Sequence, residues 1–332
     1  MNLPCYSASS SPSPPSESSS IPPSEIELTR FYPNGSIGGD FQAKWLDADA
    51  AVKLFIPDAS HSSFEQEVQL WKRLRHPNVV KMYGECEVNP NLRFFVCEFA
   101  SKGSLWENIE LISVGKLTMW THLYEAALGL EYLHERGIVH GDLRCSNILI
   151  GSDGQAKLAN FGLSRSNGSG LTSKVVVGSA RWQAPEFGDG VLPSFESDVY
   201  SLGMTILEAT TRKIPWSDQD DTRAWFHRTR WAPETDEGHP PGSPPAEIRD
   251  LVWRMCCHDP HKRVSLSSVV YELDQLILKE SSSSNDLKFE RLTSFDEYEG
   301  GNLNETWLRV QTHMKKCNDV HFFRMFDELK TA

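Results

Sequence analysis

The sequence lacks several features that would each point to a different class of protein. No apolar run approaches the ~20 residues that a membrane-spanning helix requires. The seven cysteines form no C-x-x-C pair and no metal-ligand spacing, which favours free thiols in a reducing compartment. The N-terminus has neither the basic nor the apolar region of a signal peptide, so we expect a cytoplasmic protein with no membrane span.

Positive charge is also in short supply. The chain carries 33 Lys and Arg residues against 45 Asp and Glu residues, which gives a net charge of −12. No stretch gathers Lys and Arg on one face, so we expect no nucleic-acid partner. Hydrophobic residues at 39% and charged residues at 23% are typical of a globular protein that buries a sizeable core.

The order of patterns along the 332 residues predicts an α+β fold with two lobes. Residues 1–24 contain ten serines and six prolines, so we expect a disordered tail. Residues 25–53 are strand-like, a helix and short apolar runs follow to about residue 100, and helical periods dominate residues 104–280. This order, with strands first and helices later, predicts one domain over 25–280. Residues 281–303 then read as a linker, and residues 304–332 as a helical extension with apolar stripes.

Five helices are expected within the domain. Their predicted ranges are 62–75, 117–135, 198–211, 245–257 and 266–279, from apolar residues at helical spacing. Glu67 falls on the same stripe of the first helix as Phe64, Trp71 and Leu74. A carboxylate on a buried stripe is costly unless it meets a cation, and Lys53, in the apolar run Ala50–Phe55, is the obvious partner.

The segment from His140 to Asn147 reads HGDLRCSN, and NFG follows at 160–162. This resembles the catalytic loop and metal loop of the protein kinases, usually H-R-D-x-x-x-x-N followed by D-F-G. The resemblance implies that Asp142 is the catalytic base and that Asn147 is a magnesium ligand. Asn160 replaces the main magnesium carboxylate by an amide, which leaves the activity open.

The resemblance extends to other parts of the catalytic apparatus. It implies that Lys53 holds the α- and β-phosphates of ATP and pairs with Glu67. Arg144 stands where Ser/Thr kinases have Lys, and Gly141 replaces an Arg that in many kinases binds a phosphorylated activation loop. We therefore expect an activation loop whose state is set by other contacts.

The nucleotide-binding features are unevenly retained. The phosphate loop keeps only part of the G-x-G-x-x-G pattern, through Gly35, Gly38 and Gly39, a cluster that is otherwise typical of an ordinary hairpin turn. By resemblance, the apolar residues Ala51 and Leu149 enclose the purine, and the backbone of Glu98–Ala100 forms the adenine-binding hinge. Cys97 then occupies the gatekeeper position.

The second half of the domain supports the resemblance independently. Residues 177–186 end in Ala184-Pro185-Glu186, like the close of a kinase activation segment, and Arg263 matches the residue that pairs with this glutamate. Asp198 begins the D-V-Y-S-L-G segment. It could be a plain helix N-cap, or it could hold the backbone of the catalytic loop, as the resemblance implies.

These motifs look most like the tyrosine-kinase-like group, whose members mostly phosphorylate Ser or Thr. The implied fold is the two-lobed protein kinase fold, with an antiparallel N-lobe sheet plus one helix (about 25–100) and a mainly helical C-lobe (about 104–280). We expect an ATP-binding pseudokinase that acts as a scaffold or regulator, with weakened or absent Mg²⁺ binding. The alternatives are an active Ser/Thr kinase with a protein substrate, and a small-molecule kinase, a class that also uses His-Gly-Asp.

Overall fold

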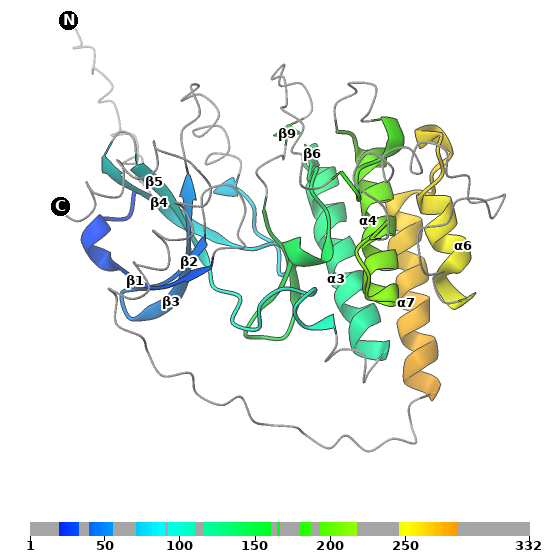
Figure 1. Ribbon diagram of the computed structural model, residues 1–332, viewed down its shortest axis with the longest axis horizontal. Helices are drawn as coiled ribbons and strands as arrows, with labels where there is room; N and C mark the ends of the chain where they lie inside the picture. The colour runs from blue at the N-terminus through cyan, green and yellow to red at the C-terminus, as the bar shows by residue number, and fades with distance from the viewer. Residues whose placement is uncertain are drawn as a thin grey trace, which may run out of the picture.

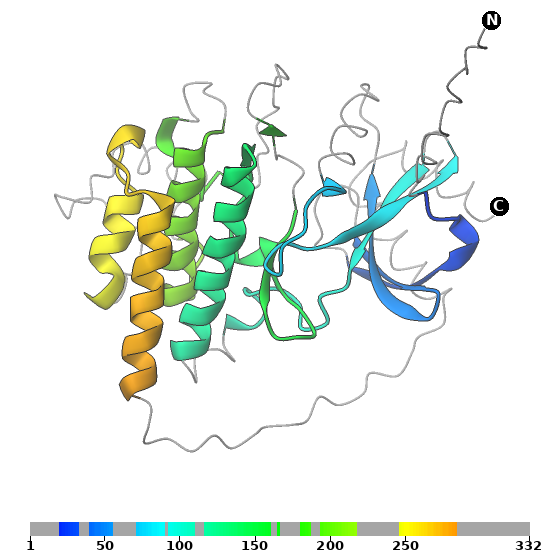
Figure 2. The ribbon, with the colours of Figure 1, turned by 180° about the vertical axis from the view of Figure 1, so that it is seen from behind.

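The computed structural model describes residues 20–32, 40–55, 71–89, 92–109, 116–160, 165–166, 180–186, 193–217 and 246–283. A β-sheet lies at one end of the molecule and a group of helices at the other (Figure 1). The view from behind shows the same division into two lobes (Figure 2). The predicted α+β, two-lobed architecture is therefore confirmed. No helix in the described ranges is long and apolar enough to cross a membrane.

The N-lobe is an antiparallel sheet of five strands in the order β1-β2-β3-β5-β4. The strands are β1 (Ile26–Tyr32), β2 (Asp40–Trp45), β3 (Ala48–Phe55), β4 (Met82–Asn89) and β5 (Leu92–Glu98). Because side chains alternate along a strand, Ala51 and Lys53 of β3 face one side while Ala50 and Val52 face the other. Ala50 and Val52 belong to a small core of their own within this lobe. The strand pattern thus directs Lys53 away from that core.

Order begins earlier in the chain than the serine-rich composition predicted. Ser20 forms a parallel bridge with Glu85 of the edge strand β4, and the Ile21 N–H donates to Glu85 O at 2.7 Å. A short 3-10 helix, η1 (Pro23–Glu25), then leads into β1. The assignment of Ser20–Ser24 to a disordered tail was wrong because Ile21 is buried in the N-lobe core and thereby offsets the entropy of ordering.

The described part of the C-lobe contains four α-helices: α3 (Lys116–Glu135), α4 (Phe195–Thr211), α6 (Ala246–Met255) and α7 (Leu266–Ser283). They lie side by side in both views (Figures 1 and 2). Leu123, Ala127 and Leu130 of α3 are fully buried in the main core, as their helical spacing predicted. Four short strands lie between α3 and α4 in the described residues. β6 (Ile138–Val139) pairs with β9 (Arg165–Ser166), and β7 (Ile148–Ile150) forms a hairpin with β8 (Ala156–Leu158).

Helix α6 ends at Met255, two residues before its predicted end at residue 257. Two other helix ends differ from the predictions for local reasons. Helix α4 begins three residues before Asp198, because Ser194 and Ser197 form a reciprocal capping box ahead of it. Helix α7 continues four residues past the predicted end at Lys279. Ser281 Oγ donates to Ile277 O at 2.7 Å and so satisfies a carbonyl in the last turns of the helix. The predicted helix at 62–75 lies mostly outside the described residues.

Candidate functional site

Asp198 anchors the catalytic loop. This carboxylate is fully buried on α4 and accepts the backbone N–H groups of His140 (2.8 Å) and Gly141 (2.9 Å). His134 of α3 lies 2.8 Å from the same side chain. Of the two roles left open by the sequence, the N-cap role is therefore wrong, because Ser194 is the cap, and the loop-holding role is confirmed. Gly141 has φ +80°, a left-handed conformation that an L-residue adopts only with strain.

The His140 side chain connects the catalytic loop to the segment that contains Asn160. It is fully buried, and burial lowers the pKa of its imidazole, so the ring is neutral near pH 7. Its Nδ1 accepts the Asp142 N–H at 3.2 Å, which leaves the proton on Nε2, 3.0 Å from Ala159 O. One ring thereby connects the residue that carries the predicted base to the residue that precedes Asn160.

Three other predicted site residues, from both lobes, meet around Asn160. The Lys53 Nζ of β3 donates to Asn160 Oδ1 at 2.7 Å. The Asn160 Nδ2 lies 3.2 Å from Asp142 Oδ2 and 3.2 Å from Asn147 Oδ1. Asn147 Nδ2 in turn donates to Asp142 Oδ2 at 2.8 Å and to Asp142 O at 2.6 Å. The amide of Asn160 thus bridges an N-lobe cation and a C-lobe carboxylate by ordinary hydrogen bonds.

The same arrangement tests whether these residues fit a magnesium ion. Mg²⁺ binds oxygen ligands and is generally held by one or two carboxylates together with substrate phosphates. Asn160 turns its N–H₂ group, not an oxygen, toward Asp142 and Asn147, and Lys53 occupies its oxygen. In the described ranges, no group of three or more His, Cys, Asp or Glu side chains is placed to hold a metal. The donor set does not fit a tightly held Mg²⁺, and the ligand role of Asn147 and Asn160 stays a prediction.

One carboxylate oxygen of Asp142 is not used in the hydrogen bonds around Asn160. The residue is buried, and its Oδ1 has no hydrogen-bond partner among the described residues. The nearest cation is Arg144, whose Nε lies 3.7 Å from this oxygen. Arg144 also lies over the Trp182 ring, with its Cζ 5.9 Å from the ring centroid. An unpartnered carboxylate oxygen beside a guanidinium is an acceptor that a substrate hydroxyl could use.

The residues predicted around the adenine come from separate strands of the two lobes. Ala51 of β3 pairs in register with Cys97 of β5, and Leu149 of β7 pairs with Ser104. Ala51 and Leu149 are both partly buried against the main core. Ala100 O accepts the Gly103 N–H at 3.1 Å, which turns the chain from β5 toward the C-lobe. Their nucleotide-binding roles, and that of Glu98, stay predictions.

Several predicted residues lie outside the described part of the chain. These are the phosphate-loop glycines Gly35, Gly38 and Gly39, the helix carboxylate Glu67, and Phe161 and Gly162 of the metal loop. The pairing of Lys53 with Glu67 therefore stays a prediction.

Glu208 is a site residue that the sequence analysis missed. Its Oε2 accepts the Cys145 N–H of the catalytic loop at 2.9 Å and the Trp182 indole N–H at 2.8 Å. Burial raises the pKa of this carboxyl to about 7, against a lowering by the hydrogen bonds and by Arg144. A glutamate in the mostly apolar run Leu202–Ala209 was the available signal, because a buried carboxylate requires donors.

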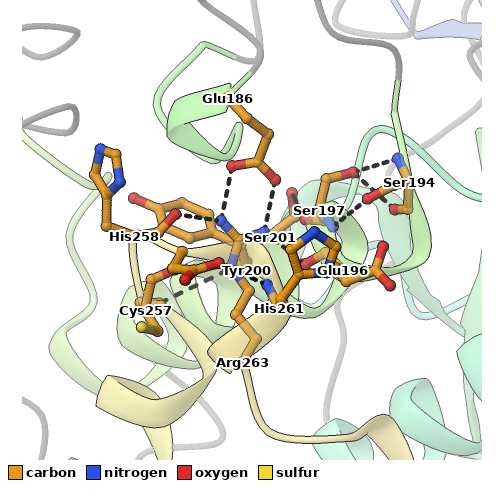
Figure 3. A network of polar contacts seen from close by, with 12 residues as sticks. Glu186, Ser194, Glu196, Ser197, Tyr200, Ser201, Cys257, His258, His261 and Arg263 are labelled. Atoms are coloured by element: carbon orange, nitrogen blue, oxygen red, sulfur yellow. Dashed lines mark hydrogen bonds and ion pairs between the residues drawn. The ribbon is translucent and has the colours of Figure 1, made fainter.

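The predicted ion pair between Glu186 and Arg263 is present in the C-lobe. The guanidinium donates to both Glu186 oxygens at 2.7 Å, and the Arg263 side chain is 1% exposed (Figure 3). Arg263 also donates to Cys257 O and Glu196 O, and its guanidinium lies over the Tyr200 ring at 5.1 Å. This bidentate pair connects the close of the activation segment to the segment before α7.

Comparison with known proteins agrees with this geometry. The family model described as "Protein kinase domain" matches residues 35–273. The chain belongs to the protein kinase family. Members of this family use ATP and Mg²⁺ and act on protein substrates.

Several proteins of similar sequence are themselves protein kinases. Serine/threonine-protein kinase CTR1 of Arabidopsis thaliana is 35% identical over 212 residues, 60% of this chain and 25% of its own. Mitogen-activated protein kinase kinase kinase 7 of Bos taurus is 30% identical over 265 residues, 76% of this chain and 44% of its own. Dual specificity protein kinase pyk3 of Dictyostelium discoideum is 29% identical over 273 residues, 79% of this chain and 20% of its own. The chain thus spans a fifth to less than half of the length of these relatives.

Proposed function

We propose that this kinase domain is a nucleotide-binding pseudokinase, which acts as a scaffold or regulator of a protein partner and transfers phosphate weakly or not at all. The observation that carries the proposal is the bridge made by Asn160, whose amide joins Lys53 to Asp142 and Asn147. In this arrangement the two predicted metal ligands, Asn147 and Asn160, are hydrogen-bonded to each other.

The electrostatic argument concerns the charge at position 160. Phosphoryl transfer depends on cations that neutralise the charge of the transferring group, and the protein contributes carboxylates that hold those cations in place. An amide removes one negative charge from the metal site, and here its oxygen is already bound to Lys53. We expect transfer to be weaker by on the order of 10²-fold or more than with a carboxylate at this position.

Nucleotide binding depends less than phosphoryl transfer on the charge at position 160. Ala51 and Leu149 are apolar residues on strands of opposite lobes, so contacts to a purine require no metal. Among the described residues, the acceptor that Lys53 meets is the neutral Asn160 oxygen, which a phosphate oxygen can replace by a charge-assisted hydrogen bond. ATP binding that depends little on Mg²⁺ follows from these two features.

A second candidate function is that of an active Ser/Thr kinase that tolerates Asn160. The observation in its favour is Asp142 Oδ1, a buried acceptor without a hydrogen-bond partner in the described structure. A base in this state is available to a substrate hydroxyl. The similarity to serine/threonine-protein kinase CTR1 favours Ser or Thr as the acceptor. The third alternative, a small-molecule kinase, has no such observation behind it.

The two candidates differ in what Asn160→Asp does to phosphate transfer. Under the proposal, this variant transfers γ-phosphate to a generic acceptor protein on the order of 10²-fold faster than the native chain. Combining Asn160→Asp with Asp142→Asn is the control, and it abolishes the gain if the transfer is the kinase reaction. Equal and robust transfer by the native chain and by Asn160→Asp would overturn the proposal in favour of the active kinase.

A further inference from the structure

A pocket outside the catalytic cluster lies where the two lobes meet. It has a volume of about 370 Å³ and is lined by Arg75, His76, Lys81, Tyr83, Glu98 and Lys157. Arg75 and His76 precede β4, Lys81 and Tyr83 flank its first residue, Glu98 ends β5, and Lys157 lies on β8. We call this the basic pocket. None of the four residues of the Asn160 bridge lines it.

Glu98 and Lys157 form an ion pair with each other. The Lys157 Nζ lies 3.1 Å from Glu98 Oε1, 3.1 Å from Asp153 Oδ2 and 3.0 Å from Pro77 O, which uses all three of its donors. Burial alone lowers the pKa of Lys157, but these two ion pairs raise it above its ordinary value. A ligand cation would therefore find the carboxylate of this pocket already neutralised.

Within the described part of the chain, two further cations of the pocket have donors without a hydrogen-bond partner. The Arg75 Nη1 donates to Lys72 O and Leu74 O, which holds the guanidinium in place, while Nε and Nη2 have no acceptor among these residues. The Lys81 Nζ lies 5.4 Å from the centroid of the Tyr83 ring. Within the described structure, no carboxylate forms an ion pair with either side chain. Two uncompensated positive charges thus line one cavity of a chain whose net charge is −12.

His76 adds a neutral donor. Its Nδ1 accepts the Asn78 N–H at 3.1 Å, so the proton of the neutral ring is on Nε2. Burial lowers the pKa of this imidazole, and Arg136 lowers it further against an opposing effect of Glu135. The ring stacks on Tyr132 with the centroids 4.7 Å apart, which fixes its plane. Near pH 7 the pocket therefore offers N–H donors from three side chains.

We propose that the basic pocket binds a phosphomonoester. A phosphomonoester carries a charge of about −1.5 to −2 at neutral pH and three strong acceptor oxygens, which suits an arginine fork, an ammonium and an imidazole N–H. The volume lies at the lower end of the range of ligand pockets, about 300–1,000 Å³, which suits a single phosphorylated group rather than a nucleotide. The Tyr83 ring provides an apolar wall for the group that carries the phosphate.

The phosphomonoester could belong to a small metabolite or to a phosphorylated side chain of a partner protein. Both present the same chemistry to Arg75 and Lys81. A phosphorylated peptide differs from a metabolite because it also contacts the protein surface around the pocket. A comparison of N-acetyl-phosphoserine amide with a phosphoserine pentapeptide distinguishes them.

The test is calorimetric titration of the full chain with N-acetyl-phosphoserine amide at constant ionic strength. Lys81→Glu is the main variant, because the Lys81 side chain is exposed and its removal leaves no buried partner behind. Lys262→Glu is the matched control, with the same charge change at an exposed position before α7. Lys53→Met reports whether the probe binds at the catalytic cluster instead. Thermal unfolding of each variant checks that it is folded.

We expect saturable binding that Lys81→Glu weakens roughly tenfold or more and that Lys262→Glu and Lys53→Met leave within about twofold. Arg75→Gln, which keeps a polar side chain, weakens it in the same direction. Tighter binding of the pentapeptide assigns a partner protein as the source, and equal binding assigns a metabolite.

Four results would each overturn the inference. They are the absence of saturable binding, an equal loss in Lys262→Glu, a loss in Lys53→Met, and equally tight binding of succinate. The first removes the site, and the second reduces it to unspecific charge. The third moves the probe to the catalytic cluster, and the fourth removes the preference for phosphate. Since no arm requires ATP, the pocket can fail while the pseudokinase proposal stands, and the reverse.

Discussion

Glu208→Gln should change how the stability of this kinase domain depends on pH. Glu208 is 3% exposed and lies between the catalytic loop and Trp182, where its Oε2 accepts two N–H groups. Burial raises the pKa of this carboxyl from 4.5 to about 7. A difference of that size corresponds to on the order of 3 kcal/mol between the protonated and ionised forms. Glutamine keeps a carbonyl acceptor for both donors and cannot ionise.

The direction of this pH dependence follows from the pH range over which the folded and the unfolded chain each bind the proton. The folded chain holds it up to about pH 7, whereas the unfolded chain releases it near pH 4.5. The stability that Glu208 contributes is therefore fully present below pH 4.5 and is lost as the pH rises through 7. Between pH 5 and pH 8, the unfolding free energy of the native chain should fall by about 2 to 3 kcal/mol relative to Glu208→Gln.

Urea denaturation followed by tryptophan fluorescence at pH 5, 6, 7 and 8 measures this difference. Subtraction of the two profiles removes the effects of other titrating groups, such as His140, which both chains share. Glu135→Gln is the control, because the Glu135 side chain is 68% exposed, and its profile should run parallel to that of the native chain. A constant offset between the native chain and Glu208→Gln across the whole range would refute the reasoning.

Three further variants test the framework of the site by denaturant unfolding. Gly141→Ala should destabilise the domain by about 1 to 2 kcal/mol, because an L-residue at φ +80° is strained; an unchanged midpoint would contradict this. Arg263→Ala should cost about 3 to 5 kcal/mol by leaving the Glu186 carboxylate unpaired, while the neighbouring exposed Lys262→Ala should cost less than about 0.5 kcal/mol. Asp198→Asn should cost about 1 to 3 kcal/mol, because an amide cannot accept both loop N–H groups without turning a donor toward one of them. Equal stability of Asp198→Asn and the native chain would show that the loop is held by other contacts.

Much of the fold could be predicted because its signals are local or periodic. The helical spacing of Leu123, Ala127 and Leu130 predicted the buried face of α3, since one face of a helix meets the core every 3.6 residues. The resemblance to the protein kinases predicted that Asp142, Asn147 and position 160 converge, and it predicted the pair of Glu186 and Arg263. These features depend on residue identity at fixed separations, which a single sequence displays.

The remainder depended on contacts between distant segments. Nothing in the residues around Asn160 indicates that its oxygen would meet Lys53, which is 107 positions away, while its nitrogen meets Asp142. The donors of Glu208 come from two loops, and the composition of the serine-rich tail concealed the burial of Ile21 against β4. In each case a tertiary contact decided the outcome, and local propensity carried no information about it.

The dependence of ATP affinity on Mg²⁺ tests the central claim most directly. Calorimetric titration of ATP into the native chain, with Mg²⁺ and with EDTA, should give dissociation constants within about threefold of each other, because Asn160 bonds to Lys53 and to one oxygen of Asp142 without a metal. In Asn160→Asp, Mg²⁺ should tighten ATP binding by about tenfold or more. ATP binding to the native chain that is lost in EDTA, or no ATP binding under either condition, would contradict the account.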